Sequence, residues 1–276
     1  MKELLIHSGE VVHKVFVYNG RLTCCPDDPR LSCDRHPLDL LPQTARCKSP
    51  QDCLHAAHEG GMSSTQSSAN DQSISKYNCE IPARVVVERG GRVDIVVLIM
   101  PGVSEDLRLN VELVGEEAEA NIYGAYVCGA DERVKIAVDM HHKVPHCNSR
   151  QLFKGIAGGS SRVDFYGKII VAQDAQRTEA YQENHNILLS DNAKVDTKPQ
   201  LEIYADDVKC SHGATIGRLN EEEQFYMRSR GITLEDAKVL QMISFIAPVL
   251  ENLPEADREQ LSAQFEDSIR NIVHNS

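Results

Sequence analysis

The chain has 276 residues, with 29 lysines and arginines against 41 aspartates and glutamates, and a net charge of −12. This length is enough to bury a substantial core, so the fold requires no disulfide or metal staple. The acidic balance and the lack of a dense lysine or arginine run exclude nucleic acid as an expected partner. Nine cysteines with irregular spacing indicate reduced thiols rather than a disulfide framework.

The start of the chain, MKELLIHSGEVVHKVFV, lacks the unbroken apolar stretch and small-residue cleavage site of a secretory signal. The longest aliphatic run, Ile95 to Met100, is far shorter than the roughly 20 apolar residues that a membrane helix needs. We therefore expect a cytoplasmic protein without a membrane partner. Within this start, VHKVFVYNG indicates an early strand.

Residues 20–80 differ from the rest of the chain and contain six of its nine cysteines, several prolines and the polar stretch SSTQSSANDQS. We expect a long excursion between the early strand and the main β body. Candidate metal ligands here are Cys47, Cys53, His55 and His58. Their spacing matches no familiar zinc motif, so cysteines in an inert loop are the favoured interpretation.

Many short β runs follow between residues 84 and 216, and turn signals such as GG, PG, GE and SDN separate them. The runs are RVVVE, VDIVVLIM, LRLNVEL, RVKIAVD, VDFYGKIIV, HNILL, AKVDT and QLEIYA. Strands without intervening helices exclude a doubly wound α/β fold and leave a sandwich, a barrel or a β-solenoid. Nearly constant spacing from about 160 to 216, without Asn-Gly hairpin dipeptides, favours stacked coils.

Two motifs in this span invite a functional interpretation. His141, His142 and His146 precede Cys147, but Pro145 and the strand-like KIAVDM argue against a helix on which histidines could share a metal. A solvated turn at the end of a strand is favoured. GIAGGSS, residues 155–161, lacks the Lys-Ser/Thr pair of a phosphate-binding loop and precedes no helical pattern, so it predicts a turn between strands.

DDVKCSHGATIG, residues 206–217, places a cysteine and a histidine two positions apart. In an unbroken strand, Cys210 and His212 share one face with Val208, Ala214 and Ile216. Because this face is the apolar one, spacing alone favours a packed cysteine and a hydrogen-bonded core histidine, both at least half-buried. A bulge at Gly213 would rotate one of them outward.

After Gly217 the pattern becomes helical. RLNEEEQFYMRSRGI has acidic residues at the expected helix start, arginines near the end and Gly231 as a C-terminal cap. A second helix is expected to begin at Thr233, whose hydroxyl caps it together with Asp236, and to kink or end at Pro248. A third is expected from Pro254 to about Val273.

The segments LFKGIAGGSSRVDFYGKIIVAQDAQRTEAYQENHNILLSDNAKVDTKPQLEIYADDVKCSHGATIG and FYMRSRGI, in this order, resemble a known family. The run from about Asn148 to Pro254 is similar to the core of the SufB/SufD proteins, scaffolds of the Suf iron–sulfur cluster assembly machinery. DDVKCSHGATIG resembles the D-type subunit, since the B-type would have a glutamate after the histidine. Family members usually begin with a helical domain, whereas this chain begins with a strand.

The resemblance implies a mainly β fold, a right-handed parallel β-helix (β-solenoid) over residues 1–219 with a C-terminal helical domain over residues 220–276. It implies a non-enzymatic scaffold that pairs with a B-type subunit and binds an ABC-type ATPase through its C-terminal helices; the isolated chain could form a homodimer. His212 matches the D-type histidine that becomes available to a nascent cluster at the subunit interface. Cys210 is a secondary candidate. We expect the iron–sulfur cluster to be transient, and no permanently bound cofactor.

The alternative is a stand-alone metal-binding or carbohydrate-active β-solenoid protein, with ligands in residues 24–58 or 141–147. Against it, the sequence has no tryptophan, aromatic residues are only 5% of the chain, and no pair of carboxylates suggests glycoside chemistry. Polysaccharide cleavage by the isolated chain, or a stoichiometric bound metal, would favour this alternative.

Overall fold

A computed structural model describes residues 3–18 and 81–274. These residues belong to one unit of the chain, residues 1–20 together with 78–276. The strands are β1 (Glu3–Ile6), β2 (Val11–Tyr18), β3 (Arg84–Val87), β4 (Arg92–Ile99), β5 (Glu105–Leu113), β6 (Glu119–Cys128), β7 (Arg133–His142), β8 (Asn148–Ala157), β9 (Arg162–Val171), β10 (Glu179–Leu188), β11 (Lys194–Ile203) and β12 (Lys209–Gly217). The helices are α2 (Glu221–Ser229), α3 (Leu234–Leu250) and α4 (Glu255–His274).

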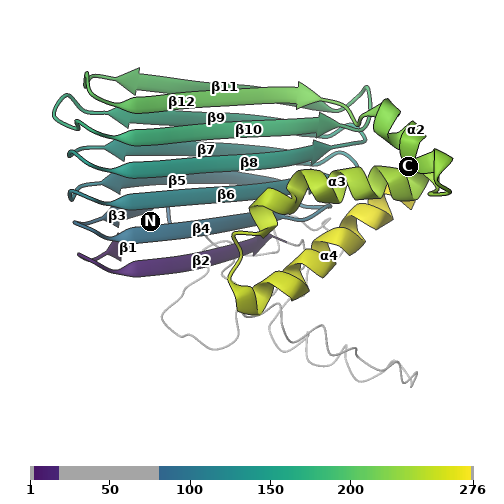
Figure 1. Cartoon of the computed structure of the whole chain (residues 1–276), viewed down its shortest axis with the longest axis horizontal. Helices are drawn as coiled ribbons and strands as arrows, with labels where there is room; N and C mark the ends of the chain where they lie inside the picture. The colour runs from purple at the N-terminus through teal and green to yellow at the C-terminus, as the bar shows by residue number, and fades with distance from the viewer. Residues whose placement is uncertain (1–2, 19–80, 275–276) are drawn as a thin grey trace, which may run out of the picture. The chain divides into compact units, whose positions relative to one another are not determined.

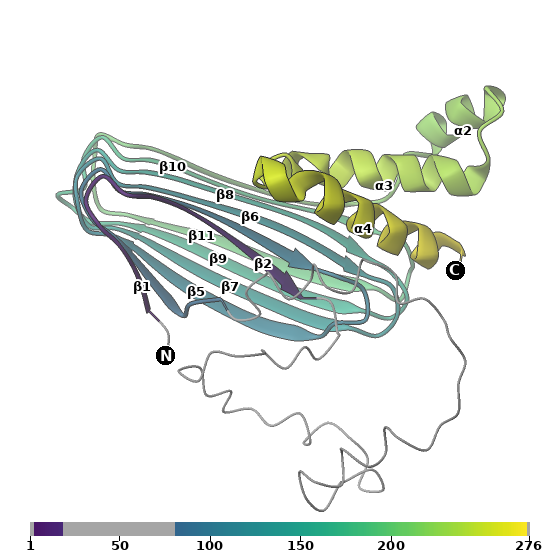
Figure 2. The same cartoon turned by 90° about the horizontal axis from the view of Figure 1, so that it is seen from below.

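Successive strands alternate between two six-stranded sheets, ordered β1-β3-β5-β7-β9-β11 and β12-β10-β8-β6-β4-β2. Neighbours within each sheet pair in parallel. Parallel pairing of every second strand requires the chain to wind through both sheets once per coil. Figure 1 shows the coils stacked on one another, and Figure 2 shows the two sheets facing each other. The predicted parallel β-solenoid followed by C-terminal helices is confirmed.

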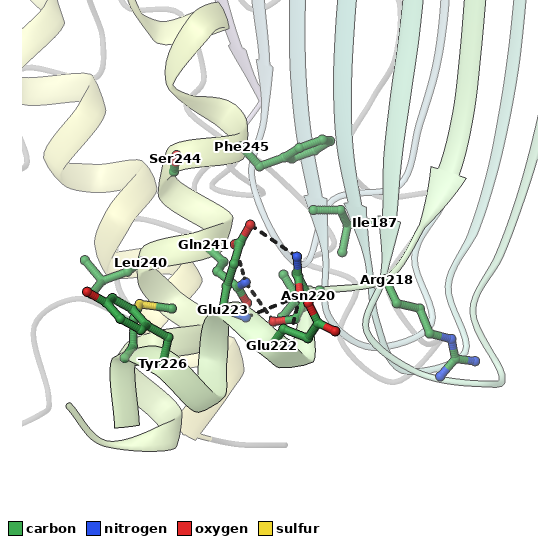
Figure 3. A pocket seen from close by; sticks show the side chains of 12 residues that line it. Ile187, Arg218, Asn220, Glu222, Glu223, Tyr226, Leu240, Gln241, Ser244 and Phe245 are labelled. Atoms are coloured by element: carbon green, nitrogen blue, oxygen red, sulfur yellow. Dashed lines mark hydrogen bonds between the residues drawn. The ribbon is translucent and has the colours of Figure 1, made fainter. Parts of the chain in front are cut away.

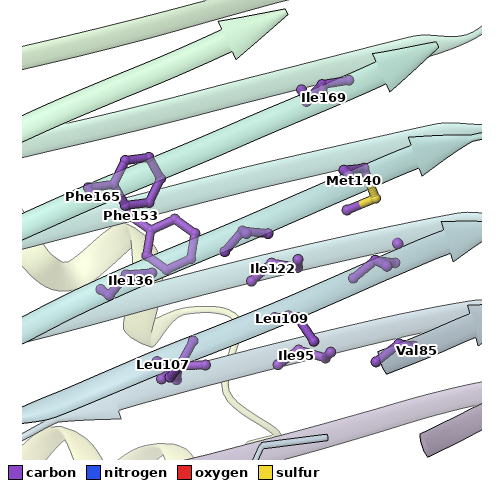
Figure 4. Packing of buried hydrophobic residues seen from close by; sticks show 14 of the residues in the cluster. Val85, Ile95, Leu107, Leu109, Ile122, Ile136, Met140, Phe153, Phe165 and Ile169 are labelled. Atoms are coloured by element: carbon purple, nitrogen blue, oxygen red, sulfur yellow. The ribbon is translucent and has the colours of Figure 1, made fainter. Parts of the chain in front are cut away.

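The core fills the space between the two sheets. Strands β7, β8 and β9 alternate buried and more exposed residues, as expected when one side of each strand faces inward. The rings of Phe153 on β8 and Phe165 on β9 meet across this space, with centroids 5.0 Å apart and an interplanar angle of 53° (Figure 4). A tilted aromatic contact at this distance is favourable beyond its apolar area.

Helix α3 covers the outer face of the even-numbered sheet and contacts β6 and β8 (Figure 2). Strand β4 of the same sheet is buried from Val93 to Ile99, on both its inward and outward sides. Burial on both sides explains why residues 95–100 form a continuous apolar run instead of an alternating one. None of the described helices is long and apolar enough to cross a membrane.

The helix signals are confirmed. The Asn220 side chain accepts hydrogen bonds from the backbone N–H groups of Glu222 and Glu223 at the start of α2. Thr233 Oγ1 accepts from the Asp236 N–H at 3.0 Å at the start of α3. Gly231, between the two helices, has φ +90°, a conformation that favours glycine. Helix α3 passes through Pro248 and ends two residues later.

Strand β11 corrects one expectation. AKVDT and QLEIYA are not separate strands, because the structure joins them through Pro199 into a single strand. Proline is tolerated since β11 is the last strand of its sheet, where one side has no neighbour to receive an N–H.

Candidate functional site

Cys210 and His212 lie on β12, the last strand of the even-numbered sheet. In the register of β10 and β12, Cys210 pairs with Ala180 and His212 pairs with Gln182. Both β10 partners are buried, with 0% and 1% of their surface exposed. Since paired residues of a parallel sheet point to the same side, Cys210 and His212 belong to the inward-facing row of the solenoid.

No further coil covers this end of the described solenoid, because β11 and β12 are the last strands of their sheets. Cys210 is half-buried and packs against the core, whereas His212 is exposed. Burial raises the pKa of the Cys210 thiol, and a backbone hydrogen bond with Ala180 acts in the opposite direction. The expectation of a half-buried residue is confirmed for Cys210 but is wrong for His212. Its ring has no hydrogen-bond partner among the described residues.

The row beneath the open end is polar. Gln182 and Asn184 on β10 are inward-facing and buried, and each has one side-chain polar atom without a hydrogen-bond partner in the described structure, Oε1 and Nδ2 respectively. Thr197 of β11, in the last coil, has an unpartnered buried Oγ1. None of these three residues belongs to a motif that the sequence makes recognisable. Their signal is a set of amide and hydroxyl side chains at inward positions of successive strands.

The histidines at the end of β7 do not form a metal site. His142 is 1% exposed, and its Nε2 lies 2.8 Å from Ser149 Oγ. Burial, and to a lesser degree His141, lower the pKa of His142 to about 4. The predicted solvated turn fits the exposed His146 but is wrong for His142, because the strand extends to His142 and its alternation directs that side chain inward.

Two further sequence motifs are the glycine-rich segment GIAGGSS and the candidate metal ligands between residues 47 and 58. GIAGGSS forms the end of β8 and the turn before β9, as expected, with Gly159 at φ +57°. Cys47, Cys53, His55 and His58 lie outside the described residues. Across residues 3–18 and 81–274, no group of three or more His, Cys, Asp or Glu side chains could hold a metal ion.

A second feature is a groove of about 870 Å³ between α2, α3 and the end of β10 (Figure 3). Its lining residues include Ile187, Arg218, Tyr226, Leu240 and Phe245. Tyr226 is 58% exposed, and the adjacent Phe225, which lines a separate hollow beside the start of α3, is 73% exposed. Large exposed aromatic side chains on neighbouring positions of one helix indicate a surface for binding another protein.

Compared with known protein families, residues 63–245 match the domain described as SUF system FeS cluster assembly, SufBD core domain. The chain belongs to the SufBD family. The match includes β12, with Cys210 and His212, and helix α2. Over 151 residues, the chain is 43% identical to the iron–sulfur cluster assembly protein SufD of Escherichia coli. The matched region covers 55% of this chain and 36% of that relative. The predicted SufD-like membership is confirmed.

Two further relatives support the same assignment. A SufBD family protein of Synechocystis is 46% identical over 110 residues, 40% of this chain and 24% of the relative. The chloroplastic protein ABCI7 of Arabidopsis thaliana is 37% identical over 170 residues, 60% of this chain and 34% of the relative. The SufBD chain therefore spans about a third or less of the length of these curated relatives.

Proposed function

We propose that this chain is a non-enzymatic scaffold subunit of Suf iron–sulfur cluster assembly in the cytoplasm, with His212 and Cys210 as ligands of a transient cluster. The observation that carries the proposal is an exposed imidazole beside a half-buried thiol at the open end of the solenoid, within the SufBD core region. The cluster is the cargo of this scaffold, and no permanently bound cofactor is required.

The chemistry of the pair suits a transient cluster. Iron–sulfur clusters bind cysteine thiolates, and histidine replaces cysteine at some irons. A neutral imidazole is a less charged ligand than a thiolate, which favours exchange over permanent binding. One thiol and one imidazole do not complete a ligand set of four. The missing ligands would come from a second subunit, so we place the site at a subunit interface.

The B-type scaffold subunit is the proposed neighbour at this interface. Among the described strands, β12 pairs only with β10, so within this part of the chain its other edge has unpaired backbone groups. The corresponding edge of the other sheet, formed by β11, is interrupted by Pro199 and carries Lys194 and Lys198, which discourage strand addition. Strand β12 has neither a proline nor a lysine beyond Lys209, which favours its edge for pairing. The same edge would support a homodimer of the isolated chain.

The ABC-type ATPase is the proposed partner of the groove between α2 and α3. Phe225 and Tyr226 project from α2, and Leu240, 44% exposed, adds apolar surface from α3. Exposed aromatic anchors of this kind often carry most of the binding free energy of an interface. The charged rim, including Arg218 and Glu222, could select the partner.

Co-purification tests the proposed assembly. The tagged chain should retain the ATPase and the B-type subunit from the native cytoplasm, identified by mass spectrometry. Phe225→Ser together with Tyr226→Ser should weaken ATPase binding by about 30-fold or more, as expected for loss of interface anchors. Tyr204→Ser is the matched control, because Tyr204 is 63% exposed but lies after β11. Equal ATPase binding by the double variant and the control would contradict the proposed docking surface.

A further inference from the structure

Three polar side chains form a row across the last strands of the even-numbered sheet. Gln151 on β8, Gln182 on β10 and His212 on β12 are paired in register. Gln151 and Gln182 are 0% and 1% exposed, whereas His212 is exposed. The row therefore leads from the core to the candidate cluster ligand at the open end.

The hydrogen bonds of this row are incomplete. Gln182 Nε2 donates to Gln151 Oε1 at 3.2 Å. Gln182 Oε1 is buried and has no hydrogen-bond partner among the described residues. Native structures rarely leave a buried acceptor unpaired, because its desolvation is not compensated. Gln151 Nε2 also has no partner among the described residues. Since the Gln182 amide nitrogen is used toward β8, a donor from the next strand, β12, would satisfy the Gln182 oxygen.

The Gln182 amide packs against the facing strand β9 where residue 167 is glycine. A Cβ added at Gly167 of β9 would lie 1.7 Å from Gln182 Nε2. The amide thus fills the space next to the Gly167 backbone, and close packing restricts its movement. A restricted amide can hold a neighbouring side chain in one orientation.

We propose that Gln182 is a positioning residue for His212. Its Oε1 accepts a hydrogen bond from one N–H of the imidazole, which continues the donor-to-acceptor direction of the Gln182–Gln151 bond by one strand. The exposed His212 ring has no hydrogen-bond partner among the described residues, so it can rotate toward this oxygen without breaking another bond. In the neutral imidazole, the other ring nitrogen is then the one without a proton.

This arrangement would prepare His212 to bind a metal. A neutral imidazole binds through its unprotonated nitrogen, and an acceptor on the other N–H determines which nitrogen that is. The role in cluster binding rests on the function proposed above. The hydrogen bond itself does not, so the two can be tested separately.

The experiment measures the tautomer of His212 in the full chain labelled with ¹⁵N-histidine, by long-range ¹H–¹⁵N NMR at neutral pH. His212→Ala assigns the signal. We expect one predominant tautomer in the wild-type protein and a mixture in Gln182→Met, which keeps the side-chain length but removes the acceptor. The Zn²⁺ concentration that half-saturates the His212 signal should rise about tenfold. His185, whose Nδ1 lies 2.8 Å from Thr215 Oγ1, is the internal control and should keep its tautomer.

Gln182→Asn serves as a second variant if Gln182→Met does not fold, because the shorter side chain withdraws the amide oxygen from His212. A folded variant with an unchanged His212 tautomer and unchanged Zn²⁺ response would overturn the inference, whatever the outcome for cluster assembly. Wild-type cluster yield in His212→Ala, combined with a tautomer that depends on Gln182, would instead overturn the proposed function and leave the hydrogen bond in place.

Discussion

The Lys154 ammonium nitrogen of β8 lies 4.6 Å from the centre of the Phe245 ring of α3. This cation–π contact connects the solenoid to the helix that covers its outer face. Burial at the contact lowers the pKa of Lys154, and the charge of Glu183 acts in the opposite direction. Because Phe245 also lines the groove between α2 and α3, the contact supports the surface to which a partner would bind.

Removing the ring should loosen this connection. Phe245→Ala is expected to lower the free energy of unfolding by about 2 kcal/mol, since a half-buried aromatic ring and its cation–π contact are both lost. Leu240→Ala on the same helix is the matched control and should cost less, because Leu240 is 44% exposed. Urea unfolding monitored by circular dichroism compares them. Equal losses would contradict the anchoring role of Phe245.

The aromatic pair in the core should be far more sensitive. Phe165→Ala is expected to cost about 3–5 kcal/mol, because it leaves a cavity beside Phe153 where both rings are 1% exposed. Tyr166→Ala changes the next residue, which points outward and is 36% exposed, and should cost roughly 1 kcal/mol or less. A small effect of Phe165→Ala in denaturant titrations would mean that the space between the sheets is not packed as described.

The buried His142 should make stability depend on pH. Its pKa is lowered to about 4 in the folded chain, against about 6.5 when unfolded. Between pH 4 and 6.5, the unfolded chain binds a proton at His142 that the folded chain does not. The contribution of His142 to the free energy of unfolding is therefore complete above pH 6.5 and is lost as the pH falls toward 4. The full loss is about 3 kcal/mol.

Urea unfolding at several pH values checks this prediction. His142→Gln should flatten the slope between pH 6.5 and 4, whereas His146→Asn, at an exposed position with φ +60°, should keep it. Asparagine is the suitable replacement there because it tolerates positive φ. An unchanged slope in His142→Gln would show that other groups cause the pH dependence.

Alkylation should distinguish the described thiols. Burial raises the pKa of Cys128 to about 12 and that of Cys147 to about 11, and both side chains are 0% exposed. Cys210 is half-buried at the open end and should therefore react first of these three in the folded protein. Peptide mass spectrometry after a timed reaction with N-ethylmaleimide measures the order. Earlier modification of Cys128 or Cys147 would contradict the described packing.

The order of strands followed by helices could be predicted from the sequence because strand runs, turn signals and helix caps are local patterns. These patterns only favoured stacked coils, and the parallel β-solenoid was implied by the family resemblance. The face on which Cys210 and His212 lie follows from their spacing, and the pairing with Ala180 and Gln182 agrees with it. The exposure of His212 could not be predicted in this way. Alternation determines the side of a strand to which a residue points, but not whether another coil covers that side.

Two other differences have the same kind of cause. His142 was assigned to a solvated turn because a proline follows closely, yet the strand continues to His142 and buries it. AKVDT and QLEIYA were expected as separate strands, yet they form one edge strand, which accommodates Pro199 between them. Gln182 has no recognisable motif at all. Its place beneath His212 depends on a register between strands that are 30 residues apart, which no local pattern specifies.

The central claim is that His212 binds a transient iron–sulfur cluster. The most direct measurement is the iron and acid-labile sulfide content of the chain purified anaerobically with its co-expressed Suf partners. His212→Ala should lose most of the cluster while the subunits remain associated, and His185→Ala on the outward side of β10 should retain it. Wild-type cluster content in an intact His212→Ala complex would contradict the claim.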